Sequence, residues 1–473
     1  MAKKIFNETA YNSEKNFTYG FAPKPVRTKN GLVIGGGLIY PEINFTLPPM
    51  NINAETMPEI LRIYKEIIDG VLKRAKELYV PGLIVEVEVL PPMTFNPEWA
   101  IDVVKTVRST MYDYEAKYEL KSAMRITPVD IREGKDVSHM WHGKHWDKIM
   151  QTFEGSARAG ADFLSIESVG GKEIHDDAIM FGDIVKSLFA LGIVGVRDMS
   201  VLWKEINSIA ADTGTIAAGD TACGFGNTAM VLADRGYVSK VFAAIVRVMT
   251  AVRSLVAYEE GAVGPHKDCG YEGVYIKAIT GTPISMEGKS SAVAHLSPVG
   301  NIAAAVADLW SNESVQHVKL LGGMAPTISL EQLVYDCRLM NTATGKGQEY
   351  NLIIKDLLTE SDSKFDPQAY VLRPDFVLNI SRELVKERSH YKRTKKAALL
   401  AINGLRKAIA SGQLIIDQRD AAWLDNMERE LEATPDDEQE FVHEMVKSND
   451  SDKFEPQKYD IKVTQKETIR KAG

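Results

Sequence analysis

Two cysteines and a glutamate, each near the end of an apolar run that stops in glycine, are the residues of this chain best suited to chemistry. Cys223 lies in TIAAGDTACGFG and Cys269 in VAYEEGAVGPHKDCG, whereas Glu167 lies in ADFLSIESVGG. Two thiols and a carboxylate at the ends of three strands match a zinc site with three protein ligands. Structural zinc usually has four protein ligands, so a set of three predicts a catalytic centre with one position open.

Other chemistry-bearing motifs compete with this interpretation. A free cysteine is most often a small apolar core residue, which is how we interpret Cys337 in EQLVYDCRLM. The segment GFGNTA at 224–229 fits the G-x-G-x-x-A pattern of a dinucleotide loop, but no other part of such a fold is evident. The motif HMWHGKH has helix-compatible spacing for a metal, although it is expected at the end of the barrel away from catalysis; its histidines are His139, His142 and His145.

Glu86 and Glu88 alternate with apolar residues in LIVEVEVL. Because successive side chains of a strand point to opposite faces, these two acids share one face. They either point into the protein as paired acids or reach outward to covering helices.

The bulk composition narrows the class of protein. The 473 residues carry a formal charge of −8, and 45% of them are hydrophobic. An acidic chain without a basic, aromatic stripe is not expected to bind nucleic acid. The start MAKKIFN has no apolar signal core, and no uninterrupted apolar run of 18 residues predicts a membrane span. Three cysteines make no disulfide framework, which favours a reducing cytoplasm where thiolates stay available to metal.

The elements that must position these residues alternate between strand and helix. Helical spacing predicts helices at 55–78 and 97–118. Strands are predicted at 83–90, 123–129, 163–168, 193–198, 215–220, 256–263, 292–296 and 318–321. Eight strands separated by helices predict a (β/α)8 TIM barrel, with a doubly wound open sheet as the alternative. We divide the chain into an N-terminal arm at 1–54, the barrel at 55–330 and an added helical C-terminal region at 331–473.

In a barrel, the carboxyl ends of the strands converge on one mouth, where active sites are built. By this count Glu167, Cys223 and Cys269 end the third, fifth and sixth strands. Three anionic ligands would leave a zinc centre with a formal charge of about −1. A glutamate in place of a third thiolate suits an oxygen ligand such as an alcohol, whose C–O bond the metal would polarise. No residue of the chain is a nucleophile strong enough to take a methyl group from an alcohol, so a partner must supply one.

The segments IESVGGKEIHD, GDTACGFGNTAM, AVRSLVAYEEGAVG and KDCGYEG resemble the zinc-binding, methanol-activating subunit of methanol:corrinoid methyltransferases. The resemblance extends over nearly the whole chain. It implies a (β/α)8 barrel that holds zinc through Glu167, Cys223 and Cys269, with methanol at the open position. It further implies methyl transfer to cob(I)amide on a separate corrinoid protein of an anaerobic methylotroph, and a homodimer that carries corrinoid subunits. None of the nine histidines lies in the D-x-H-x-x-G pattern of a cobamide-binding module, which agrees with a cofactor carried by a partner.

The residue that protonates the leaving oxygen is not fixed by these motifs. We predict Asp220, Asp198 and His266, in that order, because each falls at or near the end of a predicted strand. Three other functions remain open: a zinc-dependent methyltransferase directed at thiols, a zinc hydrolase, and a scaffold that binds a corrinoid protein without catalysis.

Overall fold

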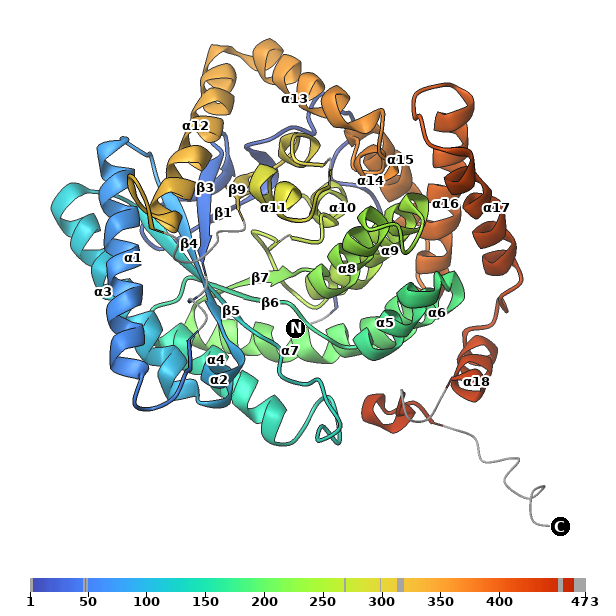
Figure 1. Cartoon of the computed structure of the whole chain (residues 1–473), viewed down its shortest axis with the longest axis horizontal. Coiled ribbons are helices and arrows are strands. Elements are labelled where there is room, and N and C mark those ends of the chain that lie inside the picture. The colour runs from blue at the N-terminus through green and yellow to red at the C-terminus, as the bar shows by residue number, and fades with distance from the viewer. Residues whose placement is uncertain are drawn as a thin grey trace.

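The computed structural model describes residues 3–45, 47, 50–267, 269–297, 299–312, 319–449 and 454–462. Seven strands of the described chain form one parallel sheet in the order β7-β6-β5-β4-β3-β9-β8 (Figure 1). The strands are β3 (Tyr40–Phe45), β4 (Leu83–Val89), β5 (Ser122–Pro128), β6 (Phe163–Ile166), β7 (Ile216–Asp220), β8 (Ser285–Glu287) and β9 (Leu309–Ser311).

Residues 263–266 close this sheet into a barrel. The Val263 amide donates to the Ala217 carbonyl of β7 at 2.9 Å. On the other side, His266 forms a parallel bridge with Ile284, just before β8. The segment thus takes the sixth position between β7 and β8, and the α/β barrel predicted from the sequence is confirmed.

Helices cover the outside of the barrel (Figure 1). The amphipathic helix α1, for example, buries Ile60, Tyr64, Ile67 and Val71 at helical spacing. The helices of this part are α1 (Met57–Glu77), α2 (Pro91–Phe95), α3 (Pro97–Tyr118), α4 (Lys144–Ala159), α5 (Lys172–Phe181), α6 (Ile184–Phe189), η1 (Ala190–Gly195), α7 (Val196–Thr213), α8 (Cys223–Asp234), α9 (Lys240–Glu259), α10 (Gly273–Thr280), α11 (Lys289–Ala294), η2 (Ile302–Ala304) and α12 (Ala325–Lys346).

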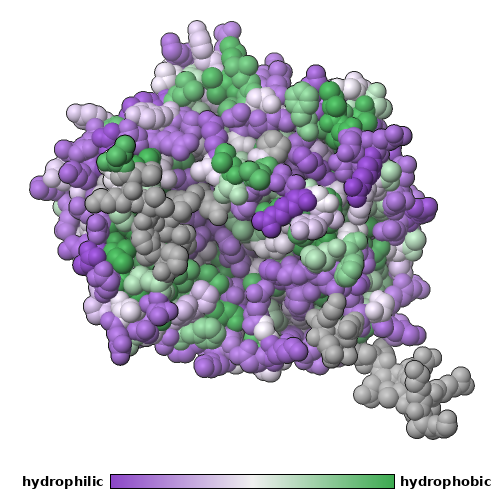
Figure 2. Space-filling view, in the orientation of Figure 1, coloured by the Kyte–Doolittle hydropathy of each residue, from purple (hydrophilic) through white to green (hydrophobic). Residues whose placement is uncertain are grey.

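The later part of the described chain is helical, and Figure 1 shows its orange and red helices along the side of the barrel that carries α9. The packing of α16 and α17 against α9 attaches this region to the barrel. Its helices are α13 (Gln348–Ser363), α14 (Pro367–Tyr370), α15 (Pro374–Leu384), α16 (His390–Ala410), α17 (Gln418–Glu432), α18 (Glu438–Ser448) and η3 (Pro456–Tyr459). On the face seen in Figure 2, exposed hydrophobic side chains occur in small groups among hydrophilic ones.

Strand alternation sorts the barrel interior into layers. At the amino ends of the strands the layer is apolar, and it contains Tyr40, Ile84, Ala123, Phe163 and Leu309. Two residues further along each strand, the same face carries Glu42, Glu86, Arg125, Ser165 and Ser311. The Arg125 guanidinium joins this middle layer, because it donates to Glu42 at 2.6 Å and to Ser165 at 2.7 Å. The interior is therefore apolar below and charged towards the mouth.

A hairpin of β1 (Phe21–Arg27) and β2 (Val33–Gly36) lies beneath the apolar layer. Its buried side chains Val26, Leu32 and Ile34 pack in one cluster with the apolar residues at the strand starts. The amino-terminal end of the barrel is therefore sealed by apolar contacts, and the carboxyl-terminal mouth is the end where polar groups gather. Glu86 and Glu88 lie on the inward-facing side of β4. Of the two orientations predicted for them, the one that points into the protein is therefore correct.

Four of the eight predicted strands are correct, at 83–90, 123–129, 163–168 and 215–220. The strand predicted at 193–198 is wrong, because these residues form the end of η1 and the start of α7. The strand predicted at 256–263 is also wrong, because α9 continues to Glu259. The segment 292–296 overlaps α11. In 318–321, residue 318 lies outside the described residues, while β10 (Lys319–Leu320) pairs with β11 (Gly323–Met324) away from the barrel.

The range predicted as an arm contains β3, which pairs with β4 on one side and β9 on the other. It therefore contributes the first barrel strand. The prediction missed β3 and added a false strand at 193–198, so the total of eight barrel positions is still correct. Among described helices, α9 alone is long and apolar enough to cross a membrane, and its apolar window is entirely buried inside the protein.

Candidate metal centre

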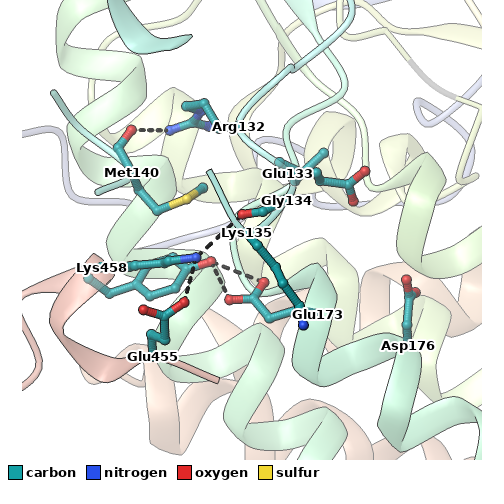
Figure 3. A pocket seen from close by; sticks show the side chains of 11 residues that line it. Arg132, Glu133, Gly134, Lys135, Met140, Glu173, Asp176, Glu455 and Lys458 are labelled. Carbon is teal, nitrogen blue, oxygen red and sulfur yellow. Dashed lines mark hydrogen bonds and ion pairs between the residues drawn. The ribbon is translucent and has the colours of Figure 1, made fainter. Parts of the chain in front are cut away.

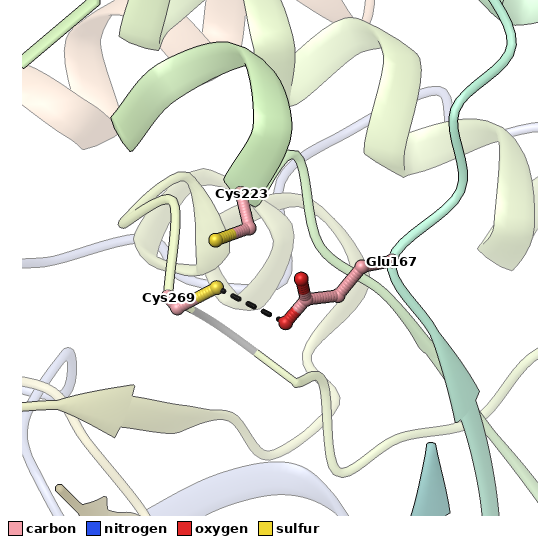
Figure 4. Close-up of side chains that lie close together, drawn as sticks. All are labelled: Glu167, Cys223 and Cys269. Atoms are coloured by element: carbon pink, nitrogen blue, oxygen red, sulfur yellow. Dashed lines mark hydrogen bonds between the residues drawn. The ribbon is translucent and has the colours of Figure 1, made fainter. Parts of the chain in front are cut away.

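The side chains of Glu167, Cys223 and Cys269 converge at the mouth of the barrel (Figure 4). Their ligand atoms all lie within 4.8 Å of one another, and they form the one cluster of three potential metal-binding groups found in the described chain. Glu167 directly follows β6, Cys223 opens α8 three residues after the end of β7, and Cys269 follows residues 263–266. These are the fourth, fifth and sixth barrel positions, so the prediction that Glu167 ends the third strand is corrected.

The donor set fits zinc in type and in spacing. Zinc bonds of roughly 2.0–2.3 Å in tetrahedral geometry separate neighbouring donors by about 3.4–3.8 Å. The Cys269 thiol lies 3.4 Å from Oε1 of Glu167. Two sulfurs and one oxygen leave one tetrahedral position for a fourth ligand.

A buried lysine neutralises part of the negative charge at this centre. Nζ of Lys267 lies 2.7 Å from Oε1 of Glu167 and 3.5 Å from Glu86 in the layer below. Burial by itself would raise the pKa of Glu167, but the Lys267 ammonium holds that pKa below its ordinary value. Glu167 is therefore ionised at neutral pH and ready to bind a cation.

The two thiols behave differently from the carboxylate. Burial raises the pKa of Cys269 well above its usual range, and the neighbouring Cys223 raises it further. The hydrogen bond with Cys269 lowers the pKa of Cys223, but burial and the charge of Glu167 outweigh it and bring that pKa to about 11. Without a metal both residues are thiols at neutral pH, so the donor set carries one negative charge.

Buried hydrogen bonds fix the two cysteine loops to each other. The Thr221 hydroxyl oxygen accepts from the amides of Cys269 and Gly270, each at 3.2 Å. The Glu272 carboxylate accepts from the Ala222 amide at 2.6 Å. Because these contacts tie both loops to one another, the thiols are pre-positioned rather than gathered by the ion.

The three residues predicted to donate a proton are fully buried, each with 0% of its surface exposed. Asp220 accepts from the Ser168 hydroxyl at 2.6 Å and from Trp203, and burial raises its pKa to about 6 although Arg253 opposes this. Asp220 therefore fixes the segment after Glu167.

Asp198 lies in the first turn of α7, where Arg132 donates to both of its oxygens at 2.8 and 2.9 Å. The same guanidinium binds Asp130 at 2.7 Å. The His266 ring lies 3.0 Å from the Tyr258 hydroxyl, and burial lowers its pKa. Asp198 and His266 thus have structural partners, and their placement does not support the proton-donor roles predicted for them.

A polar pocket of about 380 Å³, shown in Figure 3, has Val169 in its lining, two residues after Glu167. The side chain of Lys172 packs over Gly224 and pairs with Asp176 of the pocket wall. The lining residues are Arg132, Glu133, Gly134, Lys135, Met140, Val169, Glu173, Asp176, Glu455, Lys458 and Tyr459.

The histidines of HMWHGKH lie in the loop after β5 and the first turn of α4, at the mouth side of the barrel. The prediction that they lie at the opposite end is therefore wrong. His139 and His142 stack with their ring centroids 3.9 Å apart, and His145 pairs with Asp136 at 3.1 Å.

Sequence reasoning did not single out Lys267, although it lies in the motif GPHKDCG two residues before Cys269. A lysine on an exposed loop is the ordinary expectation, and only the closed barrel shows that its side chain is 3% exposed. Glu88 was noted for its alternation with Glu86, and the barrel places it in the mouth layer above Glu86.

The closed parallel barrel, with two thiols and a carboxylate gathered at its mouth, has the architecture of a barrel enzyme and a candidate metal site at the end where such enzymes place their chemistry. Residues 3–460 match the model of the family described as methanol-cobalamin methyltransferase B subunit. A methanol–corrinoid protein co-methyltransferase of Methanosarcina barkeri is 38% identical over 466 residues, which cover 97% of this chain and 100% of the relative.

A crystal structure of the methanol:cobalamin methyltransferase complex from Methanosarcina barkeri contains a chain with the same fold. Its TM-score is 0.91 at 37% identity, and the match covers 96% of this chain and 99% of that one. The chain belongs to the methanol-cobalamin methyltransferase B subunit family and is a methyltransferase.

Proposed function

We propose that this protein binds one zinc ion through Glu167, Cys223 and Cys269, and transfers the methyl group of methanol to cob(I)amide on a separate corrinoid protein. The observation that carries the proposal is the convergence of two sulfurs and one carboxylate oxygen at the barrel mouth. The related methyltransferase of Methanosarcina barkeri acts on methanol and a corrinoid protein, as its name states. The chain that shares this fold was crystallised as part of the methanol:cobalamin methyltransferase complex of Methanosarcina barkeri.

Bound zinc would supply Lewis-acid polarisation of the alcohol C–O bond and a fixed position for its oxygen. The protein groups around it perform the remaining tasks. Lys267 holds Oε1 of Glu167 at 2.7 Å and thereby orients the carboxylate. Thr221 fixes the Cys269 loop, and the apolar layer below excludes water from the far end of the barrel. Positioning of the alcohol against the incoming cobalt would contribute much of the rate.

The partner and compartment follow from the same proposal. A corrinoid protein presents its cobamide to the mouth, and the chain acts in the cytoplasm of an anaerobe, with the enzyme as a homodimer that carries corrinoid subunits. Co-elution of the purified chain with its corrinoid protein on size exclusion, with a mass corresponding to two copies of each, tests this arrangement. A monomer without bound partner at micromolar concentration contradicts it.

The decisive experiment mixes zinc-loaded protein, methanol and cob(I)alamin without oxygen and follows the cobalamin spectrum. Conversion to methylcob(III)alamin that a chelator abolishes is the expected result. If free cobalamin does not react, the cognate corrinoid protein replaces it as acceptor. Methylation of a thiol with methanol inert would instead favour a thiol-directed methyltransferase. Binding of the corrinoid protein without zinc or turnover would favour a scaffold.

A further inference from the structure

We propose that Glu88 is the acid that protonates the oxygen leaving from methanol, an inference that depends on the proposed function. Methyl transfer from an alcohol to Co(I) releases hydroxide unless a group supplies a proton. The methyl carbon bonds to cobalt, which gives the electron pair and becomes Co(III). The C–O bond breaks with its pair left on oxygen, and the carboxyl proton turns the leaving group into water.

The position of Glu88 in the barrel is the first argument. Glu88 is the last inward-facing residue of β4, since it follows Glu86 by two positions and pairs in register with Thr127 of β5. The same layer contains Asn44 of β3, and Glu167 extends it beyond β6. Glu88 therefore shares the mouth layer with a metal donor.

Access to solvent is the second argument. Of the acids that line the interior among the described residues, Glu42, Glu86 and Glu287 are buried, with 0%, 2% and 6% of their surfaces exposed. Glu88 is partly exposed, as are Glu167 and Cys223. A proton donor has to recover a proton from water after each turnover, and the partial exposure of Glu88 at the mouth allows this.

The surroundings of Glu88 are the third argument. Its Oε1 accepts a hydrogen bond from the Asn44 amide at 2.9 Å, which fixes the carboxyl group. Burial raises the pKa of Glu88 to about 7; Lys267 lowers it, while the charges of Glu167 and Glu86 raise it. The groups that act on it are Asn44 from β3, Tyr64 from α1, Glu86 from β4, Glu167 after β6 and Lys267 after residues 263–266.

The charge around Glu88 is nearly the same with and without zinc. Without the ion the donors carry one negative charge on Glu167, and with it two thiolates, one carboxylate and Zn²⁺ also sum to about −1. Burial is the largest cause of the raised pKa of Glu88, and this cause does not depend on the ion. A general acid works best when its pKa is close to the working pH.

The variant Glu88→Gln tests the inference, because glutamine keeps an acceptor for Asn44 and removes the acidic proton. Zinc content is expected to stay at the native level, since Glu88 is not a ligand. Methyl transfer to cob(I)alamin is expected to fall by about 10²–10⁴-fold at pH 7. The native enzyme should lose activity about tenfold per pH unit well above pH 7, and the variant should lack this decline.

Glu86→Gln is the matched control, because it removes an acid from the same face of the same strand one layer below the mouth. It is expected to keep the decline above pH 7. An infrared band of a protonated carboxyl group that disappears in Glu88→Gln, but not in Glu86→Gln, gives a readout independent of turnover.

Three results overturn the inference: activity of Glu88→Gln within about threefold of native, loss of the pH decline in Glu86→Gln, or an infrared band unchanged in Glu88→Gln. Failure of the proposed function gives a different pattern. The native protein then transfers no methyl group from methanol to free cobalamin or to the cognate corrinoid protein, while the infrared measurement still reports whether Glu88 holds a proton.

Discussion

Zinc binding to the cluster of Glu167, Cys223 and Cys269 is expected to release two protons per ion near neutral pH. Burial raises the pKa of Cys269 far above 7, and that of Cys223 reaches about 11, so both are protonated thiols there. Glu167 is already ionised because Lys267 keeps its pKa low. A cysteine binds zinc as the thiolate and not as the thiol. The apparent affinity should therefore rise about tenfold per pH unit for each thiol, or about 100-fold per unit for the pair.

The variant Cys269→Ala removes one of the two titrating donors. Zinc-binding free energies of about 10–16 kcal/mol for sites with four ligands correspond to roughly 3–4 kcal/mol per ligand. The affinity at pH 7 should thus fall by about 10²–10³-fold, and the pH dependence should drop to about tenfold per unit. Cys337→Ala is the matched control, because this third cysteine lies in α12 within the core and should leave both quantities unchanged.

Competition with a chromophoric chelator between pH 6 and pH 8, without oxygen, measures affinity and slope together. Calorimetry in buffers of different ionisation enthalpy counts the released protons independently. A native protein that releases one proton or none, or a Cys269→Ala variant with native affinity, would refute the ligand assignment. Equal loss of zinc in Cys337→Ala would show that general destabilisation, rather than removal of a ligand, is responsible.

Two further predictions concern stability. Arg132→Met leaves two buried carboxylates unpaired and should cost about 3–5 kcal/mol of unfolding free energy in denaturant titration. Arg62→Met removes only exposed ion pairs on α1 and should leave the unfolding free energy close to the native value; equal losses in both variants would contradict the buried-pair argument. Gly219→Ala places a Cβ 2.3 Å from the Tyr258 hydroxyl at a φ of +128°, and should lower the melting temperature. Gly345→Ala, in the last turn of α12 with nothing outside its own helix within 4 Å, should leave the melting temperature at or slightly above native, and a melting temperature of Gly219→Ala at or above native would refute the clash.

The part of the fold that the sequence predicts is the part with clear periodicity. The runs at 83–90 and 215–220 have the length and the ending of buried parallel strands, and α3 (Pro97–Tyr118) was predicted at its observed bounds. In contrast, α9 is buried on every side, so it has no polar face and no helical period to read. Its last turn was therefore taken for a strand.

Other elements are too short to leave a pattern. The strands β8 and β9 have three residues each, and residues 263–266 enter the barrel through few hydrogen bonds. Alternation requires about four or more residues to be recognised. These positions are defined by closure of the whole sheet, which no local window contains.

The convergence of Glu167, Cys223 and Cys269 could be predicted, because ligand chemistry restricts candidate metal donors to a few residue types after strands. The proton donor could not be predicted, because the sequence does not distinguish Asp198, Asp220 and Glu88, which are all acids near the ends of predicted strands. Which acid reaches the mouth depends on its partners: Asp198 is held by Arg132 and Asp220 by Ser168. Only the folded barrel shows that Glu88 remains partly exposed.

The hairpin beneath the barrel has a kinetic consequence. In the described part of the chain, Val26, Leu32 and Ile34 close the lower end of the barrel, and the cluster of Glu167, Cys223 and Cys269 faces the carboxyl-terminal mouth. For the proposed reaction, alcohol and corrinoid protein then share this mouth, which predicts an order in which methanol enters first and the corrinoid protein covers the mouth second. Product water would leave after the partner departs. A large excess of corrinoid protein should accordingly slow turnover by covering the mouth of empty enzyme.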